Sequence, residues 1–397
     1  MYKIKLNVEE LNSNLFWLVV SAGLIENLTA HIVGAHMLTY LDSLVCVFAW
    51  MIIFAISIDK HQLKLDKAIL GIIAIVLVYS FFFVIAKYRF SDFSHYFGFS
   101  TWSNFSVKNM LFFYLGTRVN IFTRSRVKSL YLILSIIYII SDLFISGKVF
   151  YDAFSMTAAY DLLMPALLFS YYLFFKKKKS CLIPLLLYVV LAIRLSRTPL
   201  LIFVAFCLVL IFIIDNTRYK RNFFISIAVS VILGGFFWFV FYDRIISSNI
   251  RTVSKLVSNS LFVSNTRVQL YSCVFDLIKN NMFAVNGVYT DRIILNNTYN
   301  LGLIYPHNIF LEFICQFGIV IGSIMSVVLI VMLCKYVFTK TDTVEGRLER
   351  YLLVFRCFIP LIVSLSYLDS IWFWALMGDM VFKLYLNIQN RKNIEDA

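Results

Sequence analysis

Long apolar runs recur from one end of the chain to the other, and they constrain the fold more than any other feature. Hydrophobic residues make up 61% of the 397 residues, and the mean hydropathy is +0.82. A soluble domain of this length does not need so much apolar surface. Most of the runs are close to the roughly 20 residues that an α-helix needs to cross a bilayer. The sequence therefore predicts an all-α, polytopic integral membrane protein that forms a single membrane domain over residues 1–397.

About twelve membrane-spanning helices are expected from these runs. Their approximate bounds are 13–30, 38–58, 68–86, 107–123, 129–147, 158–175, 181–195, 199–215, 222–241, 309–338, 351–368 and 371–387. The fourth span is weak because Arg118 interrupts it, and the seventh is short. The tenth is longer than a simple crossing needs, so we expect its first turns to lie outside the hydrocarbon core or the helix to tilt.

The basic residues indicate how the chain is oriented in the membrane. The net charge is +14, but the basic residues form short clusters between apolar runs instead of one basic face or domain. This distribution argues against a nucleic-acid-binding protein and is typical of orientation signals. With twelve spans, clusters such as 123–128, 176–179 and 217–221 lie on one side. The positive-inside rule then predicts that these loops and both termini are cytoplasmic. The N-terminus shows no small-residue cleavage site, so we expect a retained first helix.

One loop, at 242–306, is far longer than the others and is expected on the outer side between spans nine and ten. Several of its apolar residues recur at helical spacing: Leu261, Val268, Tyr271, Val274, Phe275 and Ile278. This pattern predicts an amphipathic helix that lies on or just above the membrane. A long structured loop in a compact protein is more often functional than idle.

Arginine residues on the outer side indicate an anion-binding site. Arg197, in SRTPLL, is expected at the outer end of a span, where Thr198 can cap the helix and Pro199 suits its first turn. Arg194 lies three residues earlier, on a similar face. An arginine here either extends to the lipid headgroups or binds an anion. Two arginines at one helix mouth favour the anion.

A further arginine, Arg267 in NTRVQLY, is expected to open the helix of the outer loop, with Asn265 or Thr266 as its cap. A helix start offers unpaired N–H groups and a positive dipole, and the guanidinium adds a bidentate donor. The alternative is a solvated loop arginine. Arg292 in the same loop is a further candidate for binding substrate.

The passage YPHNIFLEFICQFGIVIG, residues 305–322, places polar residues at the mouth of an apolar run. We expect Pro306 to begin the helix, so that His307 lies in its first turn. The positive helix end disfavours imidazolium and leaves a neutral ring that can accept a proton. Asn308 and Glu312 are four residues apart on one face and could orient the ring or a sugar. These two and Tyr305 are candidates for contacting the substrate, although a lone histidine is usually structural.

Other chemistries have no support in the sequence. It contains no Walker-type or dinucleotide-binding glycine pattern, no H-E-x-x-H and no G-x-S-x-G. The spacing of the seven cysteines supports neither a disulfide framework nor a zinc site. We therefore expect no metal and no cofactor. Glu26 and Asp42 are ionisable groups in or near the first two spans, where they either serve a proton path or pair with a neighbouring helix.

Taken together, SRTPLL, NTRVQLY and HNIFLE with the following FGIVIG resemble the O-antigen ligase and polymerase superfamily. The resemblance covers about residues 180–340. It implies a bacterial inner-membrane protein with its active site on the periplasmic side. It also implies that Arg197 and Arg267 hold the diphosphate of an undecaprenyl-linked oligosaccharide, while His307 activates the acceptor hydroxyl. A chain-length regulator and a flippase are the protein partners implied by this resemblance.

Within the superfamily, YPHN and the Phe- and Tyr-rich, glycine-poor chain favour a Wzy-type polymerase of O-antigen or a related surface polysaccharide. Such an enzyme uses lipid-linked oligosaccharide as both donor and acceptor. The alternative is a ligase that transfers the finished chain to the lipid A core. An alternative of another class is a transporter or flippase of lipid-linked sugars, which predicts basic residues deep in several helices.

Overall fold

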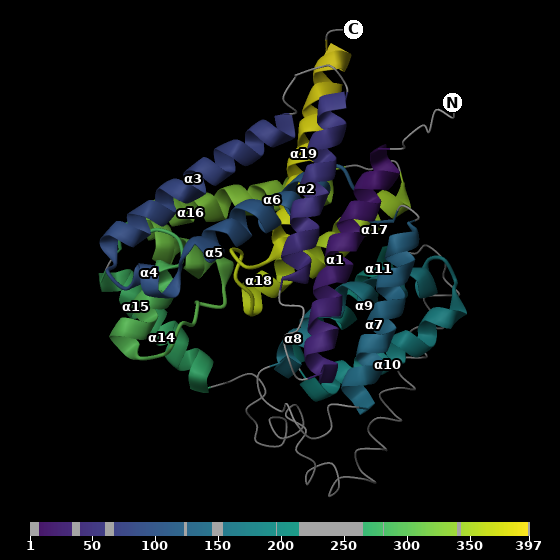
Figure 1. Ribbon diagram of the computed structural model, residues 1–397, viewed down its shortest axis with the longest axis horizontal. Helices are drawn as coiled ribbons and strands as arrows, with labels where there is room; N and C mark the ends of the chain where they lie inside the picture. Colours follow the sequence, from purple (N-terminus) through teal and green to yellow (C-terminus); the bar gives the residue numbers. More distant parts are fainter. Residues whose placement is uncertain are drawn as a thin grey trace, which may run out of the picture. The chain divides into compact units, whose positions relative to one another are not determined.

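The computed structural model describes residues 8–33, 40–59, 67–122, 125–144, 154–195, 197–213, 265–280, 282–339 and 343–395. All the regular elements in these ranges are helices (Figure 1). The chain divides into two compact units. The first comprises Met1–Gly23, Leu38–Ser129 and Asn265–Ala397, and the second comprises Leu24–Met37 and Leu130–Ser264. The predictions for the span at 222–241 and for loop residues 242–264 lie outside the described residues.

The helices of the first unit come from both ends of the chain. They are the first part of α1 (Val8–Val33), α2 (Leu41–Asp59), α3 (Lys67–Arg89), α4 (Phe93–Tyr96), α5 (Phe99–Ser103), the π-helix η1 (Asn104–Asn109), α6 (Met110–Gly116), α14 (Asn265–Asn280), α15 (Thr290–Tyr299), α16 (Ile309–Phe338), α17 (Val344–Leu353), the π-helix η3 (Val354–Phe358), α18 (Ile359–Val363) and α19 (Ile371–Glu395).

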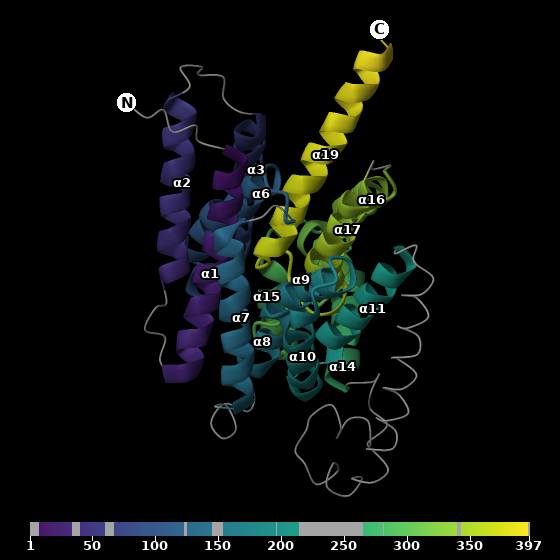
Figure 2. The same ribbon diagram turned by 90° about the vertical axis from the view of Figure 1, so that its right-hand side faces the viewer.

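The second unit holds the middle of the chain. Its helices are most of α7 (Arg126–Phe144), followed by α8 (Phe154–Asp161), α9 (Leu163–Phe174), the 3-10 helix η2 (Lys179–Cys181), α10 (Leu182–Leu195) and α11 (Arg197–Ile213). Helix α10 packs against α8, α9 and α11 (Figure 2).

Two of the described helices, α3 and α16, are long and apolar enough to cross a membrane. Shorter apolar helices lie at Leu41–Ile56, Ala158–Phe174, Lys179–Ala192 and Thr198–Ile213. Within the described residues, helices therefore occupy the predicted runs, and the number of crossings stays a prediction. Two predicted ends are wrong. The helix expected to reach 123 ends at Gly116 before a turn, and the one expected to reach 368 ends at Val363.

Helices α6 and α19 pack against each other at unusually short range in the first unit. A Cβ atom at Gly116 would overlap the backbone of Ala375, and one at Gly378 would overlap the backbone of Phe113. Two glycines on facing helices thus allow the backbones to touch, which is a common way of packing helices in membranes. This contact fixes α19 at the point where the chain leaves the 364–370 loop.

Helix α16 is broken at Gly318, which has φ 75° and ψ 169°. A straight helix of 30 residues would be about 45 Å long, which exceeds the hydrocarbon thickness of about 30 Å. The break leaves residues 319–338, whose length of about 30 Å matches that thickness. This explains the excess length seen in the sequence. A side chain at Gly318 would also press on the backbone of Phe283, at 3.1 Å.

The segment after α14 supplies hydrogen-bond partners to backbone groups of α16 that lose their helical partners at the break. The N–H groups of Asn286 and Gly287 donate to the carbonyl of Gln316, both at 2.9 Å, and the Asn286 side chain donates to the carbonyl of Cys315 at 3.0 Å. The N–H of Ile319 donates to the carbonyl of Met282 at 2.7 Å. The segment after α14 and the broken helix are therefore held together by these hydrogen bonds.

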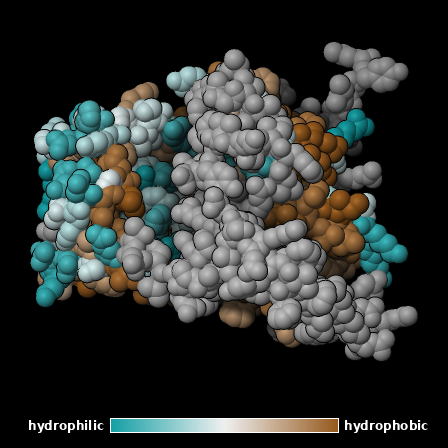
Figure 3. All heavy atoms as spheres, turned by 90° about the horizontal axis from the view of Figure 1, so that it is seen from below, coloured by the Kyte–Doolittle hydropathy of each residue, from teal (hydrophilic) through white to brown (hydrophobic). Residues whose placement is uncertain are grey.

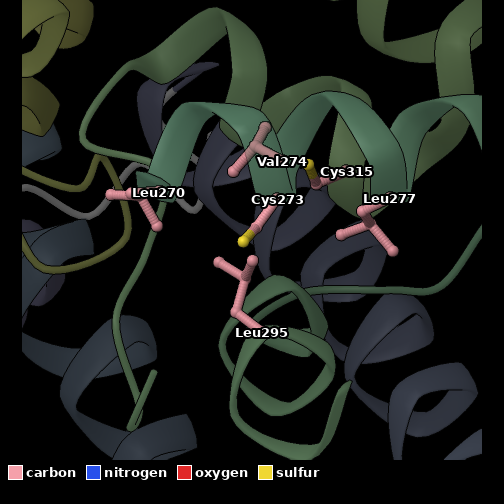
Figure 4. Packing of buried hydrophobic residues seen from close by; sticks show 6 residues of the cluster. All are labelled: Leu270, Cys273, Val274, Leu277, Leu295 and Cys315. Carbon is pink, nitrogen blue, oxygen red and sulfur yellow. The ribbon is translucent and has the colours of Figure 1, made fainter. Parts of the chain in front are cut away.

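Helix α14 is the predicted helix of the outer loop, and it packs against α15 and α16. Figure 4 shows the buried cluster between them, made of Leu270, Cys273, Val274, Leu277, Leu295 and Cys315. The apolar residues of α14 divide between two environments, because Val274 is buried whereas Val268 and Phe275 are 57% and 59% exposed. That this helix lies on or just above the membrane stays a prediction. The buried residues of α14 are those that contact α15 and α16, and they are not always its most hydrophobic residues. In Figure 3, polar residues gather at the left of the view, over the α4, α14 and α15 part of the first unit.

Candidate active site

His307 occupies a turn immediately before α16, where its backbone has φ 55°. This left-handed conformation is uncommon for any residue with a side chain, and such outliers often mark functional sites. The helix begins at Ile309, so the prediction that Pro306 begins the helix and that His307 lies in its first turn is wrong. The N-cap is Asn308, whose Oδ1 accepts from the N–H groups of Phe310 at 3.0 Å and Leu311 at 3.2 Å.

Asn308 also joins the start of α16 to the end of α18. Its Nδ2 donates to the carbonyl of Ile362 at 3.2 Å. Both ends of its amide are therefore used by the protein, which leaves less capacity for a sugar than the sequence suggested. Its position next to His307 makes it a residue that orients the ring through the backbone.

The imidazole of His307 is held by the loop that follows α18. Its Nδ1 lies 2.9 Å from the carbonyl oxygen of Ser364, which also accepts from the hydroxyl of Tyr305 at 2.8 Å. A carbonyl only accepts, so Nδ1 carries the hydrogen. Nε2 is then the atom with the lone pair and is the one that can take a proton. The Tyr305 ring meets the imidazole edge to face, with centroids 4.5 Å apart.

The surroundings keep this ring neutral. Burial lowers the pKa of His307 below its ordinary 6.5, and the hydrogen bond to Ser364 opposes the shift. The positive charges of Arg267 and Arg292 lower the pKa further. The expected neutral imidazole is thus favoured by burial and by two cations, and not by a position inside the first turn of α16.

Arg292, in α15, connects the histidine turn to the 364–370 loop. Its Nη2 donates to Asp369 Oδ2 at 2.6 Å and to the Ser366 hydroxyl at 3.1 Å. The guanidinium lies 4.8 Å from the ring centroid of Tyr289 and 5.0 Å from that of Tyr305. Burial opposes its charge, but nearby carboxylates outweigh burial and raise the pKa of Arg292. Arg292 is a fixed cation in a cage of aromatic rings.

Glu312 is fully buried in the first turns of α16. Its Oε1 accepts from the Ser366 hydroxyl at 2.5 Å and from Gln316 Nε2 at 3.4 Å. Of the two roles expected for Glu312, orienting the ring or a sugar, the structure does not support contact with a sugar, because the carboxyl group is buried against Ser366 and Gln316. Burial makes Glu312 a residue that holds Ser366, and through Ser366 the guanidinium of Arg292.

A second buried carboxyl group, Asp291, joins the same network. Its Oδ1 accepts from Gln316 Nε2 at 2.7 Å, and the Tyr367 hydroxyl donates to Gln316 Oε1 at 2.7 Å. Burial raises the pKa of Asp291 to about 6, although the charge of Arg292 opposes the rise. The network therefore ties α15, α16 and the 364–370 loop together.

The loop at 364–370 is not expected from the sequence, because most of it falls within the span predicted at 351–368. It supplies the Ser364 carbonyl, the Ser366 hydroxyl and the Asp369 carboxylate to the residues above. The available signal was its composition, SLSYLDS, between two apolar runs. Serine and aspartate favour loops and helix starts, and Ser370 indeed accepts from the N–H of Phe373 ahead of α19.

The predicted arginines fall in different units. Arg267 lies in the first turn of α14, within electrostatic range of His307. Arg194 lies near the end of α10 and Arg197 begins α11, both in the second unit, and their side chains are outside the described part of the chain. The structure thus brings together His307, Arg267, Arg292 and Tyr305. A role for Arg194 and Arg197 stays a prediction.

A cavity of about 300 Å³ lies beside Arg292. It is bounded by the turn and helices from Tyr96 to Asn109, by Tyr289 and Arg292, and by the end of the 364–370 loop. Lys108 lines it and forms an ion pair with Asp42. Of the two roles considered for Asp42, pairing with a neighbouring helix is therefore the one that the structure supports.

Comparison with known families points in the same direction as these residues. Residues 181–326 match the family model of O-antigen ligase. The predicted resemblance to the O-antigen ligase and polymerase superfamily is confirmed. No curated protein and no solved structure matches the chain. The matched stretch includes Arg197, Arg267 and His307, whereas the 364–370 loop lies beyond it.

The family match and the apolar helices together indicate a membrane-integral protein. They also indicate an O-antigen ligase or polymerase type of function, which is that of a glycosyltransferase-like enzyme on lipid-linked oligosaccharide. The match does not separate ligase from polymerase.

Proposed function

We propose that this protein polymerises oligosaccharide repeat units carried on undecaprenyl diphosphate, at the periplasmic face of the bacterial inner membrane. The product is O-antigen or a related surface polysaccharide. The observation that carries the proposal is the hydrogen bond from His307 Nδ1 to the Ser364 carbonyl, because it leaves Nε2 as a proton acceptor within electrostatic range of two arginines.

His307 is the general base of this reaction. The hydroxyl oxygen of the acceptor sugar attacks the anomeric carbon of the donor, and its proton passes to Nε2 of His307. The bond between the anomeric carbon and the diphosphate oxygen breaks, and undecaprenyl diphosphate leaves from the opposite side with inversion. A positioned base of this kind contributes roughly a hundred- to ten-thousand-fold to the rate.

Arg267 and Arg197 hold the diphosphate. Charge builds on the leaving group as the bond breaks, so arginines that bind it stabilise the transition state more than the ground state. At 4 Å and an effective dielectric constant of 20, each contact is of order 4 kcal/mol before desolvation is subtracted. Two guanidinium groups can therefore serve this leaving group without a metal. Arg267 is supported by its effect on His307, and Arg197 rests on the family motif alone.

The first test uses the purified full-length protein in lipid nanodiscs with labelled lipid-linked repeat unit. We expect longer lipid-linked oligosaccharide to accumulate with the wild-type protein and not with His307→Ala, while both proteins insert normally. A fully active His307→Ala variant would exclude the proposed role of His307. Movement of intact substrate across the bilayer without any new glycosidic bond would instead establish the transporter.

The second test separates polymerase from ligase in cells. Deletion of a polymerase leaves a single repeat unit on the surface lipid, whereas deletion of a ligase leaves finished chains on the carrier. Glycan analysis of a deletion strain gives the answer and identifies the sugar. A chain-length regulator and a flippase are the expected protein partners, and crosslinking in the wild-type strain tests both.

A further inference from the structure

The cavity beside Arg292 is built for a polar ligand. Its described lining includes the hydroxyl of Thr101, the amide of Asn104, the guanidinium of Arg292 and the carboxylate of Asp369. Asn104 and Asp369 are both exposed, with 52% of the Asp369 side chain accessible. Donors and acceptors thus face the same small space. A cavity of about 300 Å³ is at the lower end of the range for small-molecule sites.

Aromatic rings form another part of the wall. Phe97 stacks on Tyr289, with centroids 4.9 Å apart and an interplanar angle of 21°, and both rings line the cavity together with Tyr96. Rings combined with amide, hydroxyl and carboxylate groups suit a saccharide, since its hydroxyls need hydrogen bonds and its C–H faces pack on aromatic surfaces. An acyl chain would leave these polar groups without partners.

The charges in the cavity are already balanced, which argues against the diphosphate as its ligand. Arg292 is bound by Asp369, and Lys108 is bound by Asp42. A diphosphate would have to displace at least one of these carboxylates. A neutral sugar would not, because its hydroxyls can donate to Asp369 while the ion pair with Arg292 stays intact.

The cavity is also close to the proton acceptor. Arg292 lines it and packs on the Tyr305 ring, and Tyr305 packs on His307. The same loop provides Asp369 to the cavity and the Ser364 carbonyl to His307. A sugar bound here would therefore lie within a few side chains of the base that needs its hydroxyl.

We propose that this cavity is the binding subsite for the acceptor saccharide, with Thr101, Asn104 and Asp369 as its specificity-determining side chains. The proposal rests on the proposed function for its choice of ligand. The subsite binds the sugar, and neither the lipid nor the diphosphate is needed for this binding. Sequence changes in the Tyr96–Asn109 segment then alter which repeat unit is accepted.

The test measures binding of free repeat-unit oligosaccharide, released from the lipid carrier by mild acid, to the full-length protein in nanodiscs. The variants are Thr101→Val and Asn104→Leu. Their matched controls are Ser100→Val, the exposed neighbour in α5, and Asn297→Leu on the surface of α15. We expect each cavity variant to weaken oligosaccharide binding about tenfold, the size of one lost hydrogen bond, and the controls to bind like wild type.

Inhibition by inorganic diphosphate provides the second readout. We expect it to be unchanged in Thr101→Val and Asn104→Leu, and the KM for acceptor to rise with little change in kcat. The proposed subsite would be refuted if Thr101→Val and Asn104→Leu bound oligosaccharide as well as the controls do. Weaker inhibition of these two variants by diphosphate would also refute it.

The His307→Ala variant separates failure of the subsite from failure of the proposed function. It should bind oligosaccharide as wild type does and transfer none. Wild-type protein that binds oligosaccharide through the cavity without ever extending it would refute the polymerase and leave the subsite standing.

Discussion

Replacing His307 by asparagine is the sharpest test of the proposed base. Asparagine adopts the left-handed backbone readily, so the turn with φ 55° ahead of α16 is retained while the proton acceptor is lost. Loss of a positioned base should lower the transfer rate by roughly a hundred- to ten-thousand-fold. This corresponds to about 3 to 5 kcal/mol of activation free energy. His307→Ala loses the same proton acceptor but, unlike asparagine, does not favour the left-handed conformation that histidine already holds there.

The dependence of the rate on pH identifies the group. Burial and the two arginines lower the pKa of His307 below 6.5, and the neutral ring is the active form. The wild-type rate should therefore be constant around pH 7 to 8 and fall only as the pH drops below the ordinary histidine pKa of about 6.5. Initial rates of oligosaccharide extension in nanodiscs, measured across this range, give both the plateau and the acid limb.

Two results would refute this reasoning. One is an Asn variant whose plateau rate lies within about threefold of wild type, well short of what a base contributes. The other is an Asn variant that keeps the wild-type acid limb, since the titrating group would then be another residue. Thermal unfolding of both variants checks that the fold is intact.

Three further predictions concern the residues around the site. Asn308→Ala should destabilise the protein by about 1 kcal/mol, because the N-cap of α16 is lost. Asn308→Ser keeps the cap and loses only the hydrogen bond to Ile362, so the unfolding temperature should fall from wild type to Ser to Ala. Equal unfolding temperatures for the Ser and Ala variants would contradict the capping role. Gly318→Ala should lower the unfolding temperature because of its positive φ, while Gly71→Ala, which meets nothing within 4 Å, should not. Burial raises the pKa of Asp291 from 3.8 to about 6, so stability from this group is lost as the pH rises through that window. Asp291→Asn should accordingly raise the unfolding temperature most at pH 8 and least near pH 4, and a gain confined to acid pH would contradict it.

The positions of the helices could be predicted because apolar runs of bilayer length have few other solutions. The ends of the helices could not be predicted where contact with another part of the fold determines them. The break at Gly318 depends on hydrogen bonds from Asn286 and Gly287, more than 30 residues away. The buried face of α14 depends on what α15 and α16 present to it, so the exposed Phe275 could not be recognised from its hydrophobicity.

The site was predictable to the extent that polar residues stood out in apolar surroundings. His307 and Arg267 were predicted in this way, and the structure places them within electrostatic range of each other, while their roles stay predictions. The group that orients His307 is the backbone carbonyl of Ser364. Every residue has a backbone carbonyl, so the sequence does not indicate which one accepts from the histidine. The burial of Glu312 could not be predicted, because helical spacing gives a face but not the element that covers it.

The break at Gly318 divides α16 into two parts that are held in place by different surroundings. Residues 309–317 follow His307 and are anchored to the segment after α14 through Asn286 and Gly287, whereas residues 319–338 match the bilayer in length. Bilayers that are thicker or thinner should therefore tilt the second part and leave the imidazole where it is. Such an enzyme would keep its turnover rate when it is moved among lipids of different chain length.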